Sequence, residues 1–347
     1  MNVNTRKSFW SNRVRCMTKA YAAGWLSAIA TLAIGLAVFA PNPGLAQSRA
    51  SDVVTVCVVV PHFKDEYWLS VGFGLMEQAE ASSVSLRVFE SGGYHALARQ
   101  IELLDTCVAT GAQAILLGAV SADNPLLLAA VQRAAQTVPV LALVNELHSE
   151  HLAASIGVDW RKMGANVGHY LAGIHPLGSP PMRAALITGP TDSGWSPLLE
   201  SGLTEALAGS SVKIVVTRHA DTGLREQLRE VEGVLASDPR IDYLIGSAPA
   251  TEGAMGLAVR AQGRFPKLIA TYISHSVRRG LQNGRVLAVP FDDPVQQGRL
   301  GIQAALKALS EPARQFVTGP TIRLIQSGTP QALDIDLSPA SFFLDIE

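Results

Sequence analysis

Short runs of β-branched and other apolar residues alternate along the chain with segments in which apolar residues recur every three or four positions. In the first half, the runs are residues 53–60, 84–90, 114–118 and 138–144, and the segments between them are residues 66–81, 95–110 and 124–136. Continuous apolar runs of this length predict buried strands, and the periodic segments predict helices. The order strand, helix, strand indicates a parallel sheet.

The same alternation begins again after residues 155–160. The expected strands are residues 184–189, 212–218, 242–246, 267–273 and 285–291, and the expected helices are residues 195–208, 224–236, 250–262 and 294–309. The pattern therefore predicts an α/β fold with two doubly wound parallel-sheet lobes. No Gly/Ser-rich or Pro-rich linker lies near residues 158–160, so we expect short, structured connections that form a hinge and leave a cleft between the lobes.

Aromatic residues make up only 6% of the chain, yet several follow the carboxyl ends of the expected strands. In open α/β sheets, ligands bind at that edge. The first unit supplies Tyr67, Trp68 and Tyr94, and the second unit supplies Trp160, Trp195 and Tyr272. We expect these rings to face the cleft.

An enclosure of ring faces contributed by both lobes suits a methylated or quaternary ammonium group. Ring faces attract such a cation by roughly 0.5–2 kcal/mol per contact, and the cation has no N–H donor of its own. The carboxylates of Asp65, Asp159 or Asp192 could add negative charge. A purely structural reading stays open, because a lone Trp such as Trp68 can cap a core, and Asp65 and Asp192 can cap helices.

The first 46 residues have a different composition from the rest. Basic residues precede an uncharged apolar stretch from Ala20 to Ala40, which is typical of a secretory signal peptide. Small residues before Gln47 favour cleavage at that point, which would leave no stable membrane insertion. An apolar run of this length could also stay in the bilayer as an uncleaved anchor. We expect export to the periplasm.

The charge balance and the motifs exclude several classes of function. Lys and Arg number 28 and Asp and Glu number 29, which leaves no basic surface for nucleic acid. The glycines at Gly72 and Gly74 lack the third glycine of a dinucleotide loop. His148 and His151 have no third ligand nearby, which favours a surface loop over a metal site. We expect no enzyme, no metal and no cofactor.

Cleavage of the signal segment would leave Cys57 and Cys107 as the remaining cysteines. An oxidising compartment would let these thiols pair if the fold brings them together. Two buried free thiols are the alternative on the residues alone.

Three stretches carry a resemblance to a known family, namely residues 64–71 (KDEYWLSV), 86–94 (LRVFESGGY) and 111–120 (GAQAILLGAV). Over about residues 52–320 the chain resembles the type I periplasmic binding proteins. The three stretches are most similar to members that bind trimethylamine N-oxide and control a membrane sensor histidine kinase. The resemblance implies a non-enzymatic role, trimethylamine N-oxide or a similar methylated amine as ligand, and the periplasmic domain of a sensor kinase as partner.

The type I pattern also implies that hinge strands join two discontinuous lobes. It assigns residues 47–158 and 292–318 to the N-terminal lobe, and residues 159–291 and 319–347 to the C-terminal lobe. It further lays the 95–110 helix across the first strand, which implies a disulfide between Cys57 and Cys107.

Sugar-binding relatives typically carry Asp, Arg or Asn at the strand ends, where this chain is apolar around Val144, Ala248 and Ile273. Asn145 is the polar side chain that we still expect to point into the cleft. The expected ligand site consists of Asp65, Tyr67, Trp68, Tyr94, Asn145, Trp160, Trp195 and Tyr272. The alternative function is that of a solute-binding protein delivering another small osmolyte or a sugar to an ABC permease.

Overall fold

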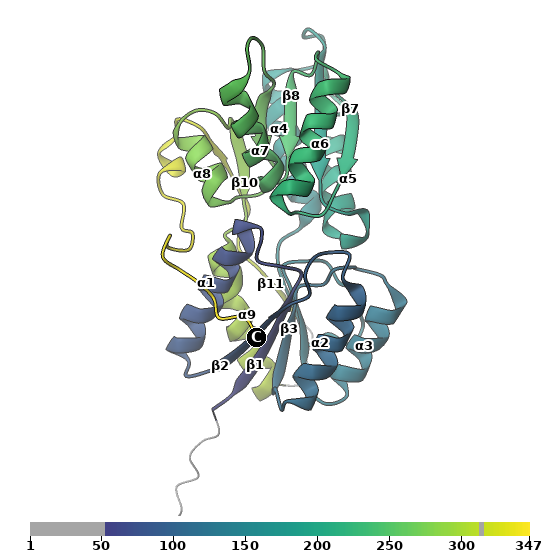
Figure 1. Cartoon of the computed structure of the whole chain (residues 1–347), viewed down its shortest axis with the longest axis vertical. Coiled ribbons are helices and arrows are strands. Elements are labelled where there is room, and N and C mark those ends of the chain that lie inside the picture. The colour runs from purple at the N-terminus through teal and green to yellow at the C-terminus, as the bar shows by residue number, and fades with distance from the viewer. Residues whose placement is uncertain (1–52, 312–315) are drawn as a thin grey trace, which may run out of the picture. The chain divides into compact units, whose positions relative to one another are not determined.

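The computed structural model describes residues 53–311 and 316–347. The predicted signal peptide, residues 1–46, and its expected cleavage before Gln47 lie outside the described residues. The described part contains two parallel sheets with helices on both faces of each (Figure 1), which confirms the predicted fold class. We call the sheet that contains the first strand, together with its helices, the first lobe, and the other sheet with its helices the second lobe.

The first lobe is built on a parallel sheet with the strand order β2-β1-β3-β4-β5-β11. Its strands are β1 (Thr55–Val60), β2 (Ser85–Glu90), β3 (Ala114–Leu117), β4 (Val140–Leu143), β5 (Ala154–Ile156) and β11 (Phe316–Thr318). Its helices are α1 (Glu66–Ala81), α2 (Leu97–Ala109), α3 (Pro125–Ala135) and α9 (Pro294–Ser310). Helices α1 and α9 pack together, and α2 packs on α3. The central strands are buried on both faces, as their unbroken apolar runs require.

The second lobe repeats this arrangement with the strand order β7-β6-β8-β9. Its strands are β6 (Met182–Thr188), β7 (Val212–His219), β8 (Tyr243–Gly246) and β9 (Lys267–Ala270), and an antiparallel pair of β10 (Ala288–Phe291) and β12 (Arg323–Gln326) continues beside β9. Its helices are α4 (Trp160–Ile174), α5 (Trp195–Leu207), α6 (Leu224–Ser237), α7 (Ala248–Arg260) and α8 (His275–Gln282), with short 3-10 turns η1 (Thr191–Ser193) and η2 (Pro330–Ala332).

Helices α4 and α8 were not predicted from the sequence. Gly164 and Gly168 weaken the helical signal of α4 because glycine is a poor helix former. The helix nevertheless forms, since Met163, Val167 and Leu171 are buried against the rest of the lobe. Helix α8 has only eight residues, too few to give a clear periodic pattern.

The chain passes between the lobes after β5, after β10, after β11 and again after η2. Two of these connections are held side by side, because the Gly157 N–H donates to the carbonyl of Thr318 over 3.0 Å. The short connections agree with the expectation that no flexible linker separates the lobes.

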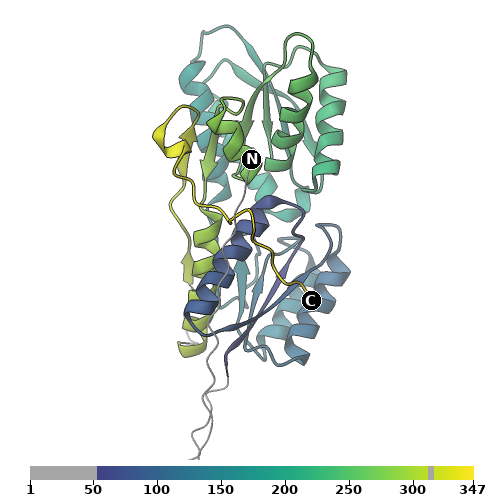
Figure 2. The ribbon, with the colours of Figure 1, turned by 60° about the vertical axis from the view of Figure 1, so that its left-hand side comes forward.

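The end of the chain differs from the expected lobe boundaries, which placed all of residues 319–347 in the second lobe. Residues 338–347 instead lie against α1 and β2 of the first lobe (Figure 2). The Phe342 ring packs on Phe73 with centroids 5.3 Å apart, and the N–H of Glu347 donates to the carbonyl of Val88. Apolar contact with α1 and pairing at the open edge of β2 explain the crossing.

Cys57 on β1 and Cys107 on α2 form a disulfide, with Cα atoms 5.8 Å apart. Both residues are fully buried. The bond ties α2 to β1, an inner strand of the first sheet, on the side away from α1.

Candidate functional site

A small cavity lies where the carboxyl ends of strands from both lobes meet. It is lined by Asp65, Tyr67, Trp68, Tyr94, Val144, Asn145, Trp160, Trp195, Thr222 and Tyr272. The structure therefore brings together all eight residues of the expected site and adds Val144 and Thr222. Asp159 and Asp192, which could have added charge, lie outside the lining; Asp159 caps α4 instead.

The first helical turn of α1 places Tyr67 and Trp68 at the cavity. Asp65 caps this helix, since its Oδ1 accepts the N–H of Tyr67 over 3.0 Å, and so the capping reading and the site reading both hold for this residue. The Trp68 ring lies over Gly118, where a Cβ atom would come within 2.6 Å of the ring. The absence of a side chain at Gly118, directly after β3, therefore makes room for the indole.

The second lobe supplies three rings that pack against one another. Trp160 and Trp195 are the first residues of α4 and α5, and their ring centroids are 5.1 Å apart. Tyr272 meets Trp195 edge to face at 5.9 Å. A Cβ atom at Gly189 would lie 2.2 Å from the Trp195 ring. The absence of a side chain at this strand end therefore makes room for the second indole.

Each tyrosine of the cavity is held through its hydroxyl by a buried polar side chain. Tyr67 donates to Oδ2 of Asp292 over 2.7 Å, and Tyr272 donates to Oδ2 of Asp65 over 2.7 Å. The hydroxyl oxygen of Tyr94 accepts from Nδ2 of Asn145 over 3.0 Å. These bonds orient the rings, since each one constrains a side chain that is otherwise held only by packing.

The two carboxyl groups behind the rings are unusually basic. Burial raises the pKa of Asp65 to about 6, and the hydrogen bond from Tyr272 only partly opposes this. Burial likewise raises the pKa of Asp292 to about 6 against the hydrogen bonds from Tyr67 and Gln297. Desolvation disfavours the charged form of an acid. These two carboxyl groups therefore become protonated at a higher pH than ordinary carboxyl groups do.

The indole N–H groups differ in their pairing. Nε1 of Trp160 donates to the carbonyl of Val144 over 3.1 Å. Nε1 of Trp195 is buried and has no partner at regular hydrogen-bond geometry among the described residues, although it lies close enough to the Tyr94 hydroxyl to oppose the rise that burial causes in the pKa of Tyr94. A buried donor without a partner costs about 1–3 kcal/mol, which a ligand oxygen could offset.

The cavity is small. About 10 Å³ is open to the centre of a water-sized sphere, which for a rounded void corresponds to a width of roughly 5 to 6 Å. That width suits a compact ligand of a few heavy atoms. A hexose would need the surrounding rings to move apart.

Several residues of the site were missed at the level of the sequence. Val144 has a positive φ of 67°, a strained conformation for a β-branched residue, and it presents its carbonyl to Trp160. Asp292 and Gln297 lie behind Tyr67. Nε2 of Gln297 donates to the Tyr67 hydroxyl and to Oδ2 of Asp292. The glycines that directly follow β3 and β6 could have been recognised in the sequence as positions that leave room for a ring, whereas no sequence pattern pointed to Asp292.

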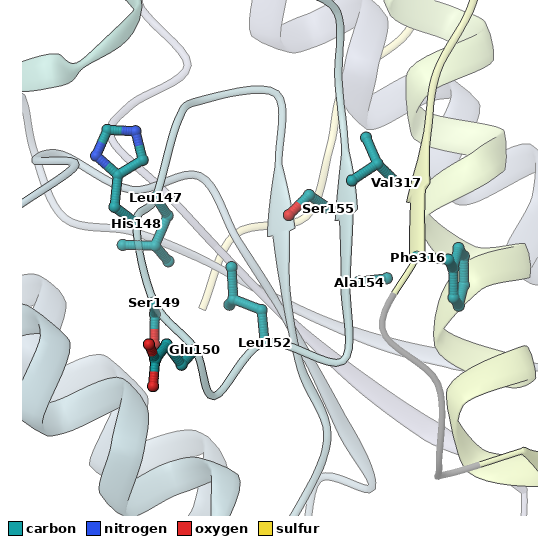
Figure 3. Close-up of a pocket in the computed structure, with 9 residues that line it drawn as sticks. All are labelled: Leu147, His148, Ser149, Glu150, Leu152, Ala154, Ser155, Phe316 and Val317. Atoms are coloured by element: carbon teal, nitrogen blue, oxygen red, sulfur yellow. The ribbon is translucent and has the colours of Figure 1, made fainter.

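A larger but open hollow lies away from these residues, with a volume of about 610 Å³. Figure 3 shows that its lining comes from the 147–152 loop and from β5 and β11. None of the expected site residues lies there. In the part of the chain that the structure describes, no three His, Cys, Asp or Glu side chains are placed to hold a metal ion.

Comparisons with known proteins identify the family. A family model described as a periplasmic binding protein domain matches residues 56–313. The periplasmic protein TorT from two strains of Escherichia coli is 34% identical over 303 residues, covering 85% of this chain and 84% of TorT. Helices long and apolar enough to cross a membrane are absent from the described ranges.

Solved structures show the same relationship. A complex of the TorS sensor domain with TorT, without ligand, has 35% identity and a TM-score of 0.73, covering 85% of this chain and all of the matched chain. The complex with trimethylamine N-oxide has 34% identity and the same TM-score and coverage. An ABC transporter solute-binding protein from Bradyrhizobium with bound bis-tris has 35% identity and a TM-score of 0.69, covering 86% of this chain and 90% of the other. This chain belongs to the periplasmic binding protein family.

Proposed function

We propose that this periplasmic protein binds trimethylamine N-oxide, or a similar methylated amine, in the aromatic cavity and thereby regulates a membrane sensor histidine kinase of the TorS type. The observation that carries the proposal is the enclosure of rings from both lobes beside a buried indole N–H that has no partner at regular hydrogen-bond geometry among the described residues. The similarity to TorT, which was solved with the TorS sensor domain and in the presence of trimethylamine N-oxide, supports it.

The chemistry of the ligand matches these groups. Trimethylamine N-oxide has three methyl groups on a positive nitrogen, one negative oxygen and no hydrogen-bond donor. The methyl groups suit the ring faces of Trp68, Trp160 and Tyr272. The oxygen needs donors, and Trp195 Nε1 makes no regular hydrogen bond within the part of the chain that the structure describes. The Tyr94 hydroxyl accepts from Asn145 Nδ2 over 3.0 Å. Its own proton faces only a long 3.5 Å contact with Asn145 Oδ1 and can turn to a ligand oxygen instead.

A sugar is a poor fit for the same cavity. Hydroxyl groups require several donors and acceptors, and most polar atoms at the lining are already paired within the protein. The small width of the cavity also disfavours the binding of a sugar. Matches to sugar-binding proteins at 17–19% identity show a shared fold alone.

A second candidate function is delivery of a small amine or another solute to an ABC permease. The Bradyrhizobium relative, described as a transporter solute-binding protein with bound bis-tris, favours this candidate at 35% identity. Bis-tris is itself a tertiary amine. The two functions can share the same cavity and differ in the membrane protein that the closed lobes contact.

We infer no catalytic role for the protein. Members of the family generally bind ligands without transforming them. Ligand binding would instead favour the conformation in which the two lobes enclose it, and so change the outer surface that a receptor contacts.

Isothermal titration calorimetry with purified protein tests the ligand. We expect binding of trimethylamine N-oxide, weaker binding of glycine betaine and choline, and no binding of D-arabinose. Trp68→Ala and Tyr94→Ala should each weaken trimethylamine N-oxide binding at least about tenfold, that is about 1.4 kcal/mol, with circular dichroism unchanged. Unaltered affinity in both variants would refute the aromatic site.

The receptor is tested separately. The periplasmic domain of a sensor kinase encoded near this protein should bind it in size-exclusion chromatography or surface plasmon resonance, with an affinity that trimethylamine N-oxide changes. Absence of any complex, together with stimulation of a permease and its ATPase by the loaded protein, would favour the transport candidate.

A further inference from the structure

Asp221 is a second-lobe residue whose side chain reaches into the first lobe. It follows strand β7, and its Oδ1 lies 3.0 Å from Nε2 of His62. Its Oδ2 accepts the backbone N–H of Tyr94 over 2.8 Å and lies 3.2 Å from Nδ1 of His95. One carboxylate therefore binds three groups of the opposite lobe.

These contacts adjoin the ligand cavity directly. Tyr94 lines the cavity, and so does Thr222, the residue after Asp221. Thr222 Oγ1 lies 3.2 Å from the same His62 nitrogen, and the His62 ring meets Tyr94 edge to face at 6.0 Å. Any separation of Asp221 from the first lobe removes the hydrogen bond that holds the Tyr94 backbone.

The surrounding residues are arranged to keep Asp221 in this place. Gly93 has a φ of 150°, and a Cβ atom there would lie 2.6 Å from Oδ2 of Asp221. On the other side, Nε2 of Gln227 donates to the carbonyls of Ala220 and Asp221 over 2.8 and 3.2 Å. Gln227 thus holds the Asp221 backbone within the second lobe, and Gly93 of the first lobe leaves room for the Asp221 carboxylate.

The electrostatics agree with an ionised carboxylate. Partial burial acts to raise the pKa of Asp221, but the hydrogen bond and charge of His62, together with the Tyr94 N–H, hold that pKa below its ordinary value. Hydrogen bonds to an ionised acceptor are about twice as strong as neutral ones.

We propose that Asp221 is a positioning residue that couples closure of the two lobes to the placement of Tyr94 in the ligand cavity. Its part in ligand affinity rests on the proposed function. Its part in holding the lobes together in the absence of ligand does not.

The test compares Asp221→Ala and Asp221→Asn with Glu200→Gln. Glu200 is a matched control, because it pairs with His219 over 3.2 Å within the second lobe. The isosteric Asp221→Asn variant keeps the shape of the side chain but replaces one of its two acceptor oxygens with a donor. It guards against a folding defect of the alanine variant.

Small-angle X-ray scattering of the ligand-free proteins is the first measurement. We expect a larger radius of gyration for both Asp221 variants than for the wild type, and no change for Glu200→Gln. Calorimetry with trimethylamine N-oxide is the second. We expect the affinity of both Asp221 variants to fall at least about tenfold and that of Glu200→Gln to stay within about twofold of the wild type.

Wild-type scattering and wild-type affinity in both Asp221 variants would overturn the inference, as would a loss of affinity without any change in scattering. A wild-type protein that binds no trimethylamine N-oxide would contradict the proposed ligand. The scattering comparison would still decide whether Asp221 holds the lobes together.

Discussion

Tyr272 of the second lobe donates a 2.7 Å hydrogen bond to Oδ2 of Asp65, the residue that caps helix α1 of the first lobe. The two residues are 207 positions apart in the chain, and both line the aromatic cavity. The bond therefore joins the start of α1, which carries Tyr67 and Trp68, to the ring that packs on Trp195. Lobe contact and cavity geometry depend on the same pair.

The buried indole N–H of Trp195 gives a test of how the ligand oxygen is bound. Trp195→Phe keeps a ring but removes the N–H. We expect trimethylamine N-oxide affinity to fall at least about tenfold, because a hydrogen bond to a charged acceptor contributes about 1.5–3 kcal/mol. Calorimetry should show a change of less than about twofold for tetramethylammonium, which has no oxygen and depends on ring faces alone.

Equal losses for the two ligands would mean that the variant damages the ring enclosure rather than one hydrogen bond. The free energy of unfolding serves as the control. It should not decrease by more than the effect of the smaller ring, since the N–H makes no regular hydrogen bond with the described residues.

The glycines that directly follow β6 and β3 give a second test. Gly189→Ala would place a Cβ atom 2.2 Å from the Trp195 ring, and Gly118→Ala would place one 2.6 Å from Trp68. The rings must shift, and such overpacking costs about 1–3 kcal/mol. We expect a decrease in melting temperature and at least about a tenfold loss of trimethylamine N-oxide affinity.

Gly233→Ala is the matched control, because no neighbouring heavy atom lies within 4 Å of a Cβ at that position in α6. Alanine is favoured over glycine in a helix by about 0.5–1 kcal/mol, so this variant should be slightly more stable and bind normally. Full affinity in Gly189→Ala and Gly118→Ala would contradict the view that these glycines make room for the indoles.

The buried acids predict a pH dependence of stability. Burial raises the pKa of Asp65 and of Asp292 to about 6, from an ordinary 3.8. Folding therefore favours the protonated acids. Their contribution to stability is full below about pH 4 and is lost as the pH rises through about 6. Between pH 5 and pH 7.5 each group should lower the free energy of unfolding by about 1.4 kcal/mol.

Guanidinium unfolding at these two pH values checks this expectation. Asp292→Asn keeps an acceptor for the Tyr67 hydroxyl but removes one titrating group. The decrease in unfolding free energy should therefore be smaller in the variant by about 1.4 kcal/mol. The same decrease in both proteins would show that Asp292 does not titrate as its burial implies.

The disulfide between Cys57 and Cys107 should matter for stability and not for binding. The bond closes a segment with a sequence separation of 50, for which chain entropy predicts about 4 kcal/mol of stabilisation. Urea unfolding of Cys57→Ala/Cys107→Ala should show a loss of about this size, while the trimethylamine N-oxide affinity stays within about twofold. Neither cysteine lines the cavity.

Free-thiol titration of the unfolded wild type provides the direct check. Equal thiol counts with and without reductant would mean that the bond does not form in the protein as purified. An unfolding midpoint that reductant leaves unchanged would lead to the same conclusion.

Much of the architecture could be read from the alternation of apolar runs with helical periodicity. Helix α1 was predicted with the bounds that the structure has, because its buried face recurs with a clear period and Asp65 stands before it. The placement of rings after strand ends was also readable, since parallel strands bring all their carboxyl ends to one edge. Helix α4 was not, because its glycines hide a helix that tertiary burial stabilises.

By itself, the sequence determined two α/β lobes and which aromatic side chains reach the edge where they meet, because these properties follow from local periodicity. Only the tertiary structure decided which polar groups hold those rings. The partners of Tyr67, Tyr272 and Tyr94 include Asp292, Asp65 and the backbone-binding Asp221, all far away along the chain. Hydrogen bonds between distant residues depend on how the lobes pack together, and no local pattern encodes that packing.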